Sequence, residues 1–582
     1  MMKIALTELP PNILRLICLC CRRGTLFNVA TTCRLLSNPA LQSIWHTIPC
    51  FAVMAFTLPP ELRECEVTEP KPHERPFWRA VKTVWTMSFN RTLAPSDLAR
   101  FQLYAQFVRS IDTYSIRRSA FLLRPTAWLE LEGVLVPGCL PNLRSLIKHD
   151  IVRSTVEPMR IFLSHNLRHL EYNFYDLDRA GPARTPIAEP AAGWVAGLFA
   201  GVAHDTSDVR VFHLFLPRSI ITALRASELL LEAVPKLSTV VSFQIPYNIP
   251  IPPGALSHLS GYSQLHSLAM VIRCEEFLEG VPEIPHSSFP ALRTIKIMVD
   301  STSWCTAFLS KVCSPQVSSV SLDIDVPARP DDCNALFTTL ACHPSAAVLE
   351  TLTVRFGGST NDPSVPILPP VLLPLCSLHS LQRIRIDCGC YTAVDDDSLL
   401  QMVRAWPQLR MADLCRSYDM SSAPRVTLSG LAAVMEHCRN IHTLKVPLED
   451  IDGREVSALL ARKPPKIFEP TSAADSPGET RLTQPLFCPL MRLGVGPSVI
   501  TKDDVGGVAA VLSQWFPALR SIEYYFRHMP SRTAGGLEHG GPPADLNMNP
   551  NEQQDRWQEV AEMVPAMALA RTQEQLWAYV QR

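Results

Sequence analysis

The chain has 582 residues and 47% of them are hydrophobic, so it can bury a large core. Its 54 basic and 55 acidic residues give a formal net charge of −1, which excludes a strong overall attraction to nucleic acid or to an anionic membrane. The apolar run Trp194 to Ala203 is too short to span a bilayer, and the sequence has no secretory signal and no cysteine pairs at metal spacing. These features predict an intracellular protein, cytoplasmic or nuclear or both, that binds neither membrane nor nucleic acid.

Residues 4–50 differ from the rest of the chain because their apolar residues follow a helical period. Leu9-Pro10 opens the segment and Gly24 interrupts it. Three apolar stripes predict three short helices: Ile13, Leu14 and Ile17; then Leu26, Val29, Ala30 and Cys33; then Leu41, Ile44 and Trp45. Residues 51–100 have a mixed pattern and are interpreted as a linker or first cap.

Residues 101–527 repeat one unit, in which apolar residues stand at offsets 0, 3 and 5. Leu292, Ile295 and Ile297 are one example, and the pattern returns at intervals of roughly 24 to 32 residues. A proline stands two residues before the first apolar position in several units, as at Pro290 and Pro315, where it ends a helix and leaves an extended segment after it. Such units bury their apolar side by stacking, which predicts an α/β solenoid with a curved parallel sheet inside and helices outside.

Other features of the repeats and the C-terminal region follow from composition. Surface loops are expected at residues 178–193, 357–370 and 463–485, which are rich in Pro, Gly, Ser or Thr. A flexible linker is expected at 528–551, before a C-terminal helix over 552–582 that Pro565 is expected to kink or split and that caps the array or lies over its sheet. The acidic run Asp395 to Asp397 precedes an amphipathic segment and predicts helix capping rather than metal binding.

The first fifty residues resemble an F-box and the repeats resemble leucine-rich repeats. Leu9-Pro10, Ile13-Leu14, Ile17, Leu26, Val29, Cys33-Arg34, Leu36, Leu41 and Trp45 follow the F-box order, with Asn12 and Thr25 where acidic residues are commoner. The repeats match L-x-x-L-x-Φ but lack a regular asparagine after the strand. The resemblance implies that the opening residues dock on a Skp-type adaptor: Leu9, Pro10, Ile13, Leu14 and Ile17. The alternative is a helical cap that shields the first repeat from water.

Catalytic and cofactor motifs are absent from the sequence. It contains no phosphate-binding glycine loop, no H-E-x-x-H and no G-x-S-x-G, and its 16 histidines are dispersed without metal spacing. The sequence therefore predicts no enzyme activity, no cofactor and no metal site.

Charged side chains at offsets 2, 4 and 6 are expected on the sheet face away from the helices, because alternate residues of a strand point to opposite sides. We expect a protein substrate to bind there through Lys296, Arg355, Arg383, Arg385 and Lys445, with Asp323, Asp387 and Asp413 among them. Arg355 is expected beside Arg383 and Arg385. The alternative is a solvated surface of mixed charge.

Together the resemblances imply a substrate receptor of an SCF-type cullin–RING ubiquitin ligase, in which the adaptor joins the chain to the cullin scaffold. Such a receptor is not a catalyst, because it raises the concentration of substrate near a recruited conjugating enzyme. A leucine-rich-repeat scaffold without a ligase role is the alternative function, and an unrecognised hydrolase is a more distant one.

Overall fold

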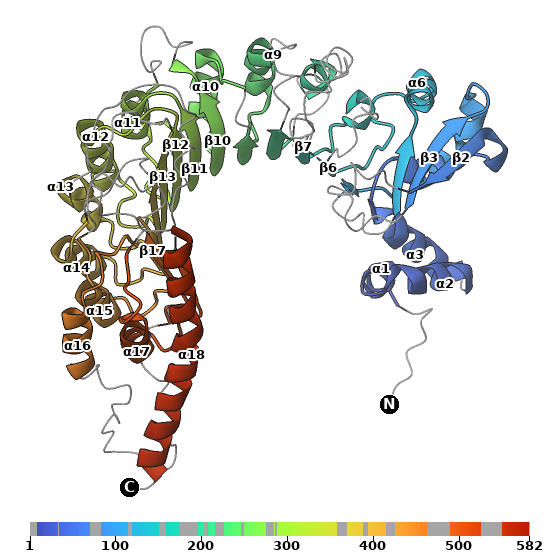
Figure 1. The fold of residues 1–582 in the computed structure, drawn as a ribbon. Helices are drawn as coiled ribbons and strands as arrows, with labels where there is room; N and C mark the ends of the chain where they lie inside the picture. The colour runs from blue at the N-terminus through green and yellow to red at the C-terminus, as the bar shows by residue number, and fades with distance from the viewer. Residues whose placement is uncertain are drawn as a thin grey trace, which may run out of the picture. The chain divides into compact units, whose positions relative to one another are not determined.

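The computed structural model describes most of the chain, in two compact units that comprise Met1–Glu276 and Phe277–Arg582 (Figure 1). The described residues are 9–32, 34–69, 83–113, 119–149, 159–173, 196–202, 204, 208–215, 226–245, 249–274, 284–285, 288–357, 369–387, 394–414, 425–462, 489–496, 498–524 and 550–580. The loops expected at 178–193 and 463–485, and nearly all of the loop at 357–370 and of the linker at 528–551, lie outside them. No helix in these ranges is both long enough and apolar enough to cross a membrane.

Three helices open the first unit where the sequence predicts them: α1 (Pro11–Leu19), α2 (Arg23–Thr32) and α3 (Arg34–His46). Pro11 stands at the first helical position of α1, where a missing N–H costs nothing. Their core is small: Cys18, Leu26 and Ala40 are buried, and residues of the other predicted stripes pack against them. Trp45 stacks on Tyr104 with ring centroids 4.8 Å apart, which attaches the three helices to the segment that follows.

The first unit then builds a parallel sheet from short strands, one for each repeat. Its hydrogen-bonded order is β1-β4-β6-β7-β8-β9-β10. The strands are β1 (Thr47–Ile48), β4 (Ser110–Asp112), β6 (Ser145–His149), β7 (His169–Asn173), β8 (Val211–Phe215), β9 (Ser242–Gln244) and β10 (Ser267–Ile272). Helices α4 (Ala52–Ala55), α5 (Ala99–Ala105), α6 (Pro125–Val134), α9 (Ala226–Ala233) and α10 (Pro253–Ser260) lie between them in the sequence. The parallel sheet thus begins at Thr47, well before the expected start at residue 101.

A second, three-stranded sheet occupies much of the region that the sequence suggests is a linker. Strand β3 (Thr83–Phe89) pairs antiparallel with β2 (Arg63–Thr68) and parallel with β5 (Ser119–Leu123). The rings of Phe56 and Trp85 both pack on that of Phe121, with centroids 5.6 and 6.3 Å away. The region interpreted as a linker or first cap therefore contains a small sheet. The sequence carries little sign of it, because strands this short, with one mostly exposed, have a weak apolar alternation.

The second unit continues the repeat, and its parallel sheet has the order β11 to β18. The strands are β11 (Thr294–Val299), β12 (Ser319–Ile324), β13 (Thr351–Phe356), β14 (Arg383–Asp387), β15 (Met411–Asp413), β16 (Thr443–Lys445), β17 (Arg492–Gly496) and β18 (Ser521–Tyr524). The helices are α11 (Thr302–Lys311), α12 (Pro330–Ala341), α13 (Pro369–Leu372), α14 (Asp396–Ala405), α15 (Leu428–His437), α16 (Gly453–Ala461), α17 (Val505–Trp515) and α18 (Pro550–Val580). Figure 1 shows α11 to α16 following one another along one side of the strands. The predicted α/β class with a large parallel sheet is confirmed.

The repeat register predicted from the offsets is confirmed by burial. Leu292, Ile295 and Ile297 are all buried, and so are their counterparts in the following repeats, such as Leu352 and Val354. Strand pairing aligns them in rows, because Ile295 pairs with Val320 and Val320 pairs with Leu352. The side chains at the intervening offsets therefore form the other face of the sheet, here called the open face.

The acidic run also acts as predicted, and it links two repeats. Asp395 is the N-cap of α14 and accepts a hydrogen bond from the Ser398 N–H at 2.9 Å. Asp395 also accepts a hydrogen bond from the Ser398 hydroxyl at 2.6 Å. The hydrogen bonds from the hydroxyl and the N–H of Ser398 hold the pKa of Asp395 below its ordinary value. Asp396 instead accepts from the N–H and the hydroxyl of Thr427, the N-cap of α15, at 2.9 and 2.6 Å. The carboxylates thus stabilise helix N-termini, and one of them connects neighbouring helices.

The C-terminal helix α18 is continuous through Pro565, so the expected split is wrong. It packs against α17 and β18, the last elements of the repeat array. Trp557 is buried and its indole N–H donates to the Ser498 carbonyl at 2.9 Å, while Arg571 donates to the Ala510 carbonyl at 2.8 Å. Of the two expected placements the structure therefore shows a cap on the end of the array, which covers its last apolar layer.

Candidate functional site

Helix α1 carries two apolar stripes, and one of them faces solvent. Leu14 and Cys18 are one turn apart and are both buried, and Cys18 forms a core cluster with Leu26 of α2 and Ala40 of α3. Ile13, Leu16 and Ile17 lie on the neighbouring side of the helix and are between 41% and 57% exposed. Further large apolar side chains of the three helices are exposed as well: Leu19, Phe27 and Leu35. We call these six residues the apolar surface of the helical segment.

The residues predicted to bind an adaptor divide into two groups. Pro10, Ile13 and Ile17 are exposed, and Leu9 is partly buried. Leu14 is 3% exposed, so in this structure it is covered rather than available on the surface as expected. It packs inward because it shares a helical face with Cys18. Sequence analysis did not select Leu16, Leu19, Phe27 or Leu35. Their signal is that three short helices carry more large apolar residues than so small a core can bury.

A pocket lies where the helical segment meets the first repeats, and its lining is basic. It is lined by Arg15, Gln42, His46, Gln106, Phe107, Arg109 and Asn142. Burial and the nearby Arg15, Arg109 and Arg144 lower the pKa of His46, and burial together with Arg144 and Arg15 also lowers the pKa of Arg109. None of these three arginines forms an ion pair within the described residues. The pocket therefore favours an anionic group.

On the open face of the second unit, strand pairing places the predicted substrate-binding residues in three rows. Arg383 belongs to the row Thr294, Ser319, Thr351, Arg383, Met411, Thr443, Arg492 and Ser521. A second row runs Lys296, Ser321, Thr353, Arg385, Asp413, Lys445, Gly494 and Glu523. The third runs Met298, Asp323, Arg355 and Asp387. Arg355 thus lies between two aspartates, and its expected position beside Arg383 and Arg385 is wrong. The reason is that it occupies offset 6 of its repeat, whereas they occupy offsets 2 and 4.

Acidic neighbours on adjacent strands neutralise most of these cations. Arg355 lies 3.8 Å from Asp323, whose pKa is raised mainly by burial and lowered less strongly by Arg355. Arg385 Nε lies 3.5 Å from an oxygen of Asp413, whose side chain is 4% exposed. Lys296 also acts electrostatically on Asp323. Arg383 is exposed and has no ion pair within the described part of the chain, so among the five predicted residues it is the cation most available to a partner.

Lys445 reaches an acidic partner two strands away because the intervening strand has no side chain at that position. Its ammonium contacts a carboxylate oxygen of Glu523 on β18. Gly494 of β17 pairs with both Lys445 and Glu523, and a Cβ at this glycine would lie 2.9 Å from Lys445 Cγ. The glycine therefore allows the lysine stem to cross the strand.

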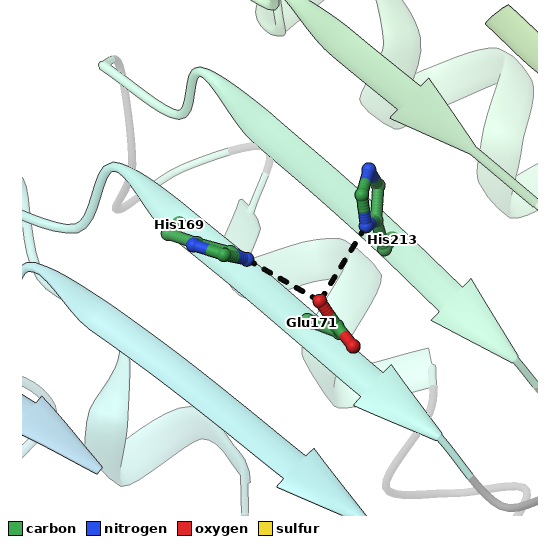
Figure 2. A group of neighbouring side chains, drawn as sticks. All are labelled: His169, Glu171 and His213. Carbon is green, nitrogen blue, oxygen red and sulfur yellow. Dashed lines mark ion pairs between the residues drawn. The ribbon is translucent and has the colours of Figure 1, made fainter. Parts of the chain in front are cut away.

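In the first unit, three side chains of metal-binding type converge on the sheet (Figure 2). His169 and Glu171 lie on β7, and His213 lies on β8 directly opposite Glu171. His169 Nε2 is 3.4 Å and His213 Nδ1 is 3.5 Å from the same Glu171 oxygen. Burial lowers the pKa of His213 and His169 lowers it further, against the opposing effect of Glu171. Sequence analysis missed this cluster because its histidines are 44 positions apart by residue number; the signal is their shared face, at offsets 2 and 4 of consecutive repeats.

No protein-family model matches this chain, and a search of curated proteins returned no significant match.

Proposed function

We propose that this chain is an F-box protein with leucine-rich repeats that serves as a substrate receptor of an SCF-type cullin–RING ubiquitin ligase. Helices α1 to α3 would dock on a Skp-type adaptor bound to the cullin, and the open face of the repeats would hold a protein substrate. The chain would supply proximity rather than chemistry, because a separately recruited enzyme transfers ubiquitin.

The observation that carries this proposal is the apolar surface of the helical segment. Leu16 and Phe27 are 57% and 65% exposed, and Ile13 and Ile17 lie beside Leu16 on α1. Exposure of six large apolar side chains on three short helices is typical of a surface that a protein partner covers. This surface also argues against a cap, since a cap would turn its apolar side toward the repeats.

Substrate recognition would rest on charge positions rather than on net positive charge. Acidic and basic side chains are interspersed along the rows of the open face, so a partner must match their positions to avoid leaving a charge unpaired. Arg383 is the residue from which an acidic substrate side chain would gain most.

The test is capture of a Skp-type adaptor by the full chain. Ile13→Asp with Ile17→Asp is expected to abolish capture, because two carboxylates would be buried in an apolar interface. Leu129→Asp is the matched control, since Leu129 is 66% exposed on α6, outside the helical segment. Circular dichroism is expected to be unchanged in both variants. Undiminished capture by the folded double variant would refute the docking proposal, and a wild-type chain that captures no adaptor would favour a scaffold without a ligase role.

Substrate binding is tested separately. Arg383→Glu is expected to keep the fold and the adaptor while losing captured substrates. Arg293→Glu is the control in the same unit, because Arg293 is also exposed but directly precedes β11 and lies outside the strand. If both variants retain the wild-type set of captured proteins, the open face near β14 is not the recognition surface.

A further inference from the structure

His169, Glu171 and His213 are brought together by the regular pairing of two neighbouring strands. Parallel strands lie about 4.8 Å apart, and residues two positions apart on one strand point to the same face. Glu171 pairs with His213, and His169 precedes Glu171 by two residues. The three side chains therefore come from a rigid part of the fold rather than from a loop.

The distances suit a first-row divalent ion. Tetrahedral zinc has bonds of about 2.0–2.1 Å to histidine nitrogen and carboxylate oxygen, which places its ligand atoms about 3.3–3.4 Å from one another. Two separations in this cluster are 3.4 and 3.5 Å, and all the candidate ligand atoms lie within 4.8 Å of one another. Metal binding would require the two imidazole nitrogens to lie at about the same spacing from each other.

Two further contacts point to a ligand between the side chains. His213 Nε2 is 2.8 Å from the hydroxyl oxygen of Ser242 on β9, which leaves Nδ1 directed at the cluster. A histidine that holds a metal commonly donates its other N–H to such an acceptor. His169 Nε2 is buried and makes no hydrogen bond within the described residues, and Figure 2 shows it directed at Glu171. Its contact with the Glu171 oxygen at 3.4 Å is longer than an ordinary hydrogen bond, and an ion bound by both atoms would account for that separation.

We propose that His169, Glu171 and His213 form a binding site for a divalent transition-metal ion, with Zn²⁺ as the ion that fits this ligand set. The proposal is independent of the proposed ligase function. Two imidazoles and one carboxylate give three protein ligands, so a fourth position remains for water or for a side chain of a bound partner. The side chains are between 19% and 31% exposed, which permits entry of an ion from solvent.

The experiment uses the full chain after treatment with a chelator. Titration with Co²⁺ is expected to give visible ligand-field absorption from one bound ion, and Zn²⁺ is expected to displace it. Separate His169→Ala, Glu171→Gln and His213→Ala variants are expected to lose this absorption, whereas His379→Ala, at an exposed histidine of the second unit, is expected to keep it. Ser242→Ala is expected to weaken binding about 10- to 100-fold, because it removes the group that orients His213.

Circular dichroism and thermal unfolding without metal establish that each variant is folded. Glu171→Gln keeps the shape of the side chain, so it tests the site even if a histidine variant does not fold. Equal metal affinity in the wild type and the folded ligand variants would overturn the proposal and place any bound ion elsewhere on the chain. Absence of Co²⁺ and Zn²⁺ binding by the wild type would also overturn it, leaving a hydrogen-bonded cluster without a metal.

Discussion

Gly494→Ala tests the strand register on which the open face depends. An added Cβ would lie 2.9 Å from Lys445 Cγ, 3.0 Å from its Cβ and 3.3 Å from its Cα. Carbon atoms normally approach to about 3.5–4.0 Å, and the Cα and Cβ of Lys445 cannot move without moving strand β16. We therefore expect a loss of about 1–3 kcal/mol in the free energy of unfolding. Displacement of Lys445 from Glu523 would add at most about 1 kcal/mol.

Gly506→Ala is the matched control, since it makes the same chemical change where nothing lies within 4 Å of the new Cβ. Gly506 lies in α17, where alanine is expected to stabilise by about 0.4–1 kcal/mol. Denaturant unfolding of both full-length variants is expected to separate them by at least about 1.5 kcal/mol. If Gly494→Ala were as stable as Gly506→Ala, β16 and β17 would not pair in the register described, and the rows of charges would be misassigned.

Three further predictions concern the core, the open face and pH. Leu292→Ala, at a fully buried position, is expected to cost about 2–5 kcal/mol in denaturant unfolding, and a loss below about 1 kcal/mol would contradict the repeat register. A double-mutant cycle of Arg385→Ala and Asp413→Ala is expected to give a coupling of about 0.5–3 kcal/mol, and additive losses would show that the pair does not interact. Burial lowers the pKa of His343, so the unfolded chain takes up a proton first and stability is expected to fall as pH drops below about 6.5. His343→Gln should flatten part of the change in unfolding free energy between about pH 7.5 and pH 5.5, and an unaltered slope would exclude this histidine as a source.

The repeat strands were predictable because their signal is local and repeated. Burial of offsets 0, 3 and 5 forces one face inward in every repeat, so Leu292 and its counterparts could be placed without a structure. The start of the sheet at Thr47 was not predictable in this way, since β1 has two residues and carries no period. The continuity of α18 through Pro565 was not predictable either. Proline is locally unfavourable inside a helix, whereas the packing that buries Trp557 against the last repeat is a tertiary contact.

The candidate sites depended on a different kind of information, the alignment between strands. Arg355, Arg383 and Arg385 share a face because their offsets of 6, 2 and 4 are all even. Residues pair at equal offsets, however, so Arg355 lies between Asp323 and Asp387 rather than beside the other two arginines. The same information would have brought Glu171 and His213 together, because both occupy offset 4. Comparing residues at equal offsets in consecutive repeats is therefore the step that converts a repeat pattern into a list of side-chain neighbours.

This alignment also bears on the substrate binding that we propose for the open face, because it determines which cations a partner would find unpaired. Arg385 and Lys445 flank Asp413 in one row, and the lysine reaches Glu523 across Gly494, so the charges are balanced before any partner arrives. A ligand that merely carries negative charge gains little there, because it must compete with carboxylates already held by the sheet. A ligand that places an acidic group at Arg383 gains a partner for a cation that has no ion pair among the described residues, without breaking one already formed. Selectivity on such a surface comes from the position of the charge more than from its amount.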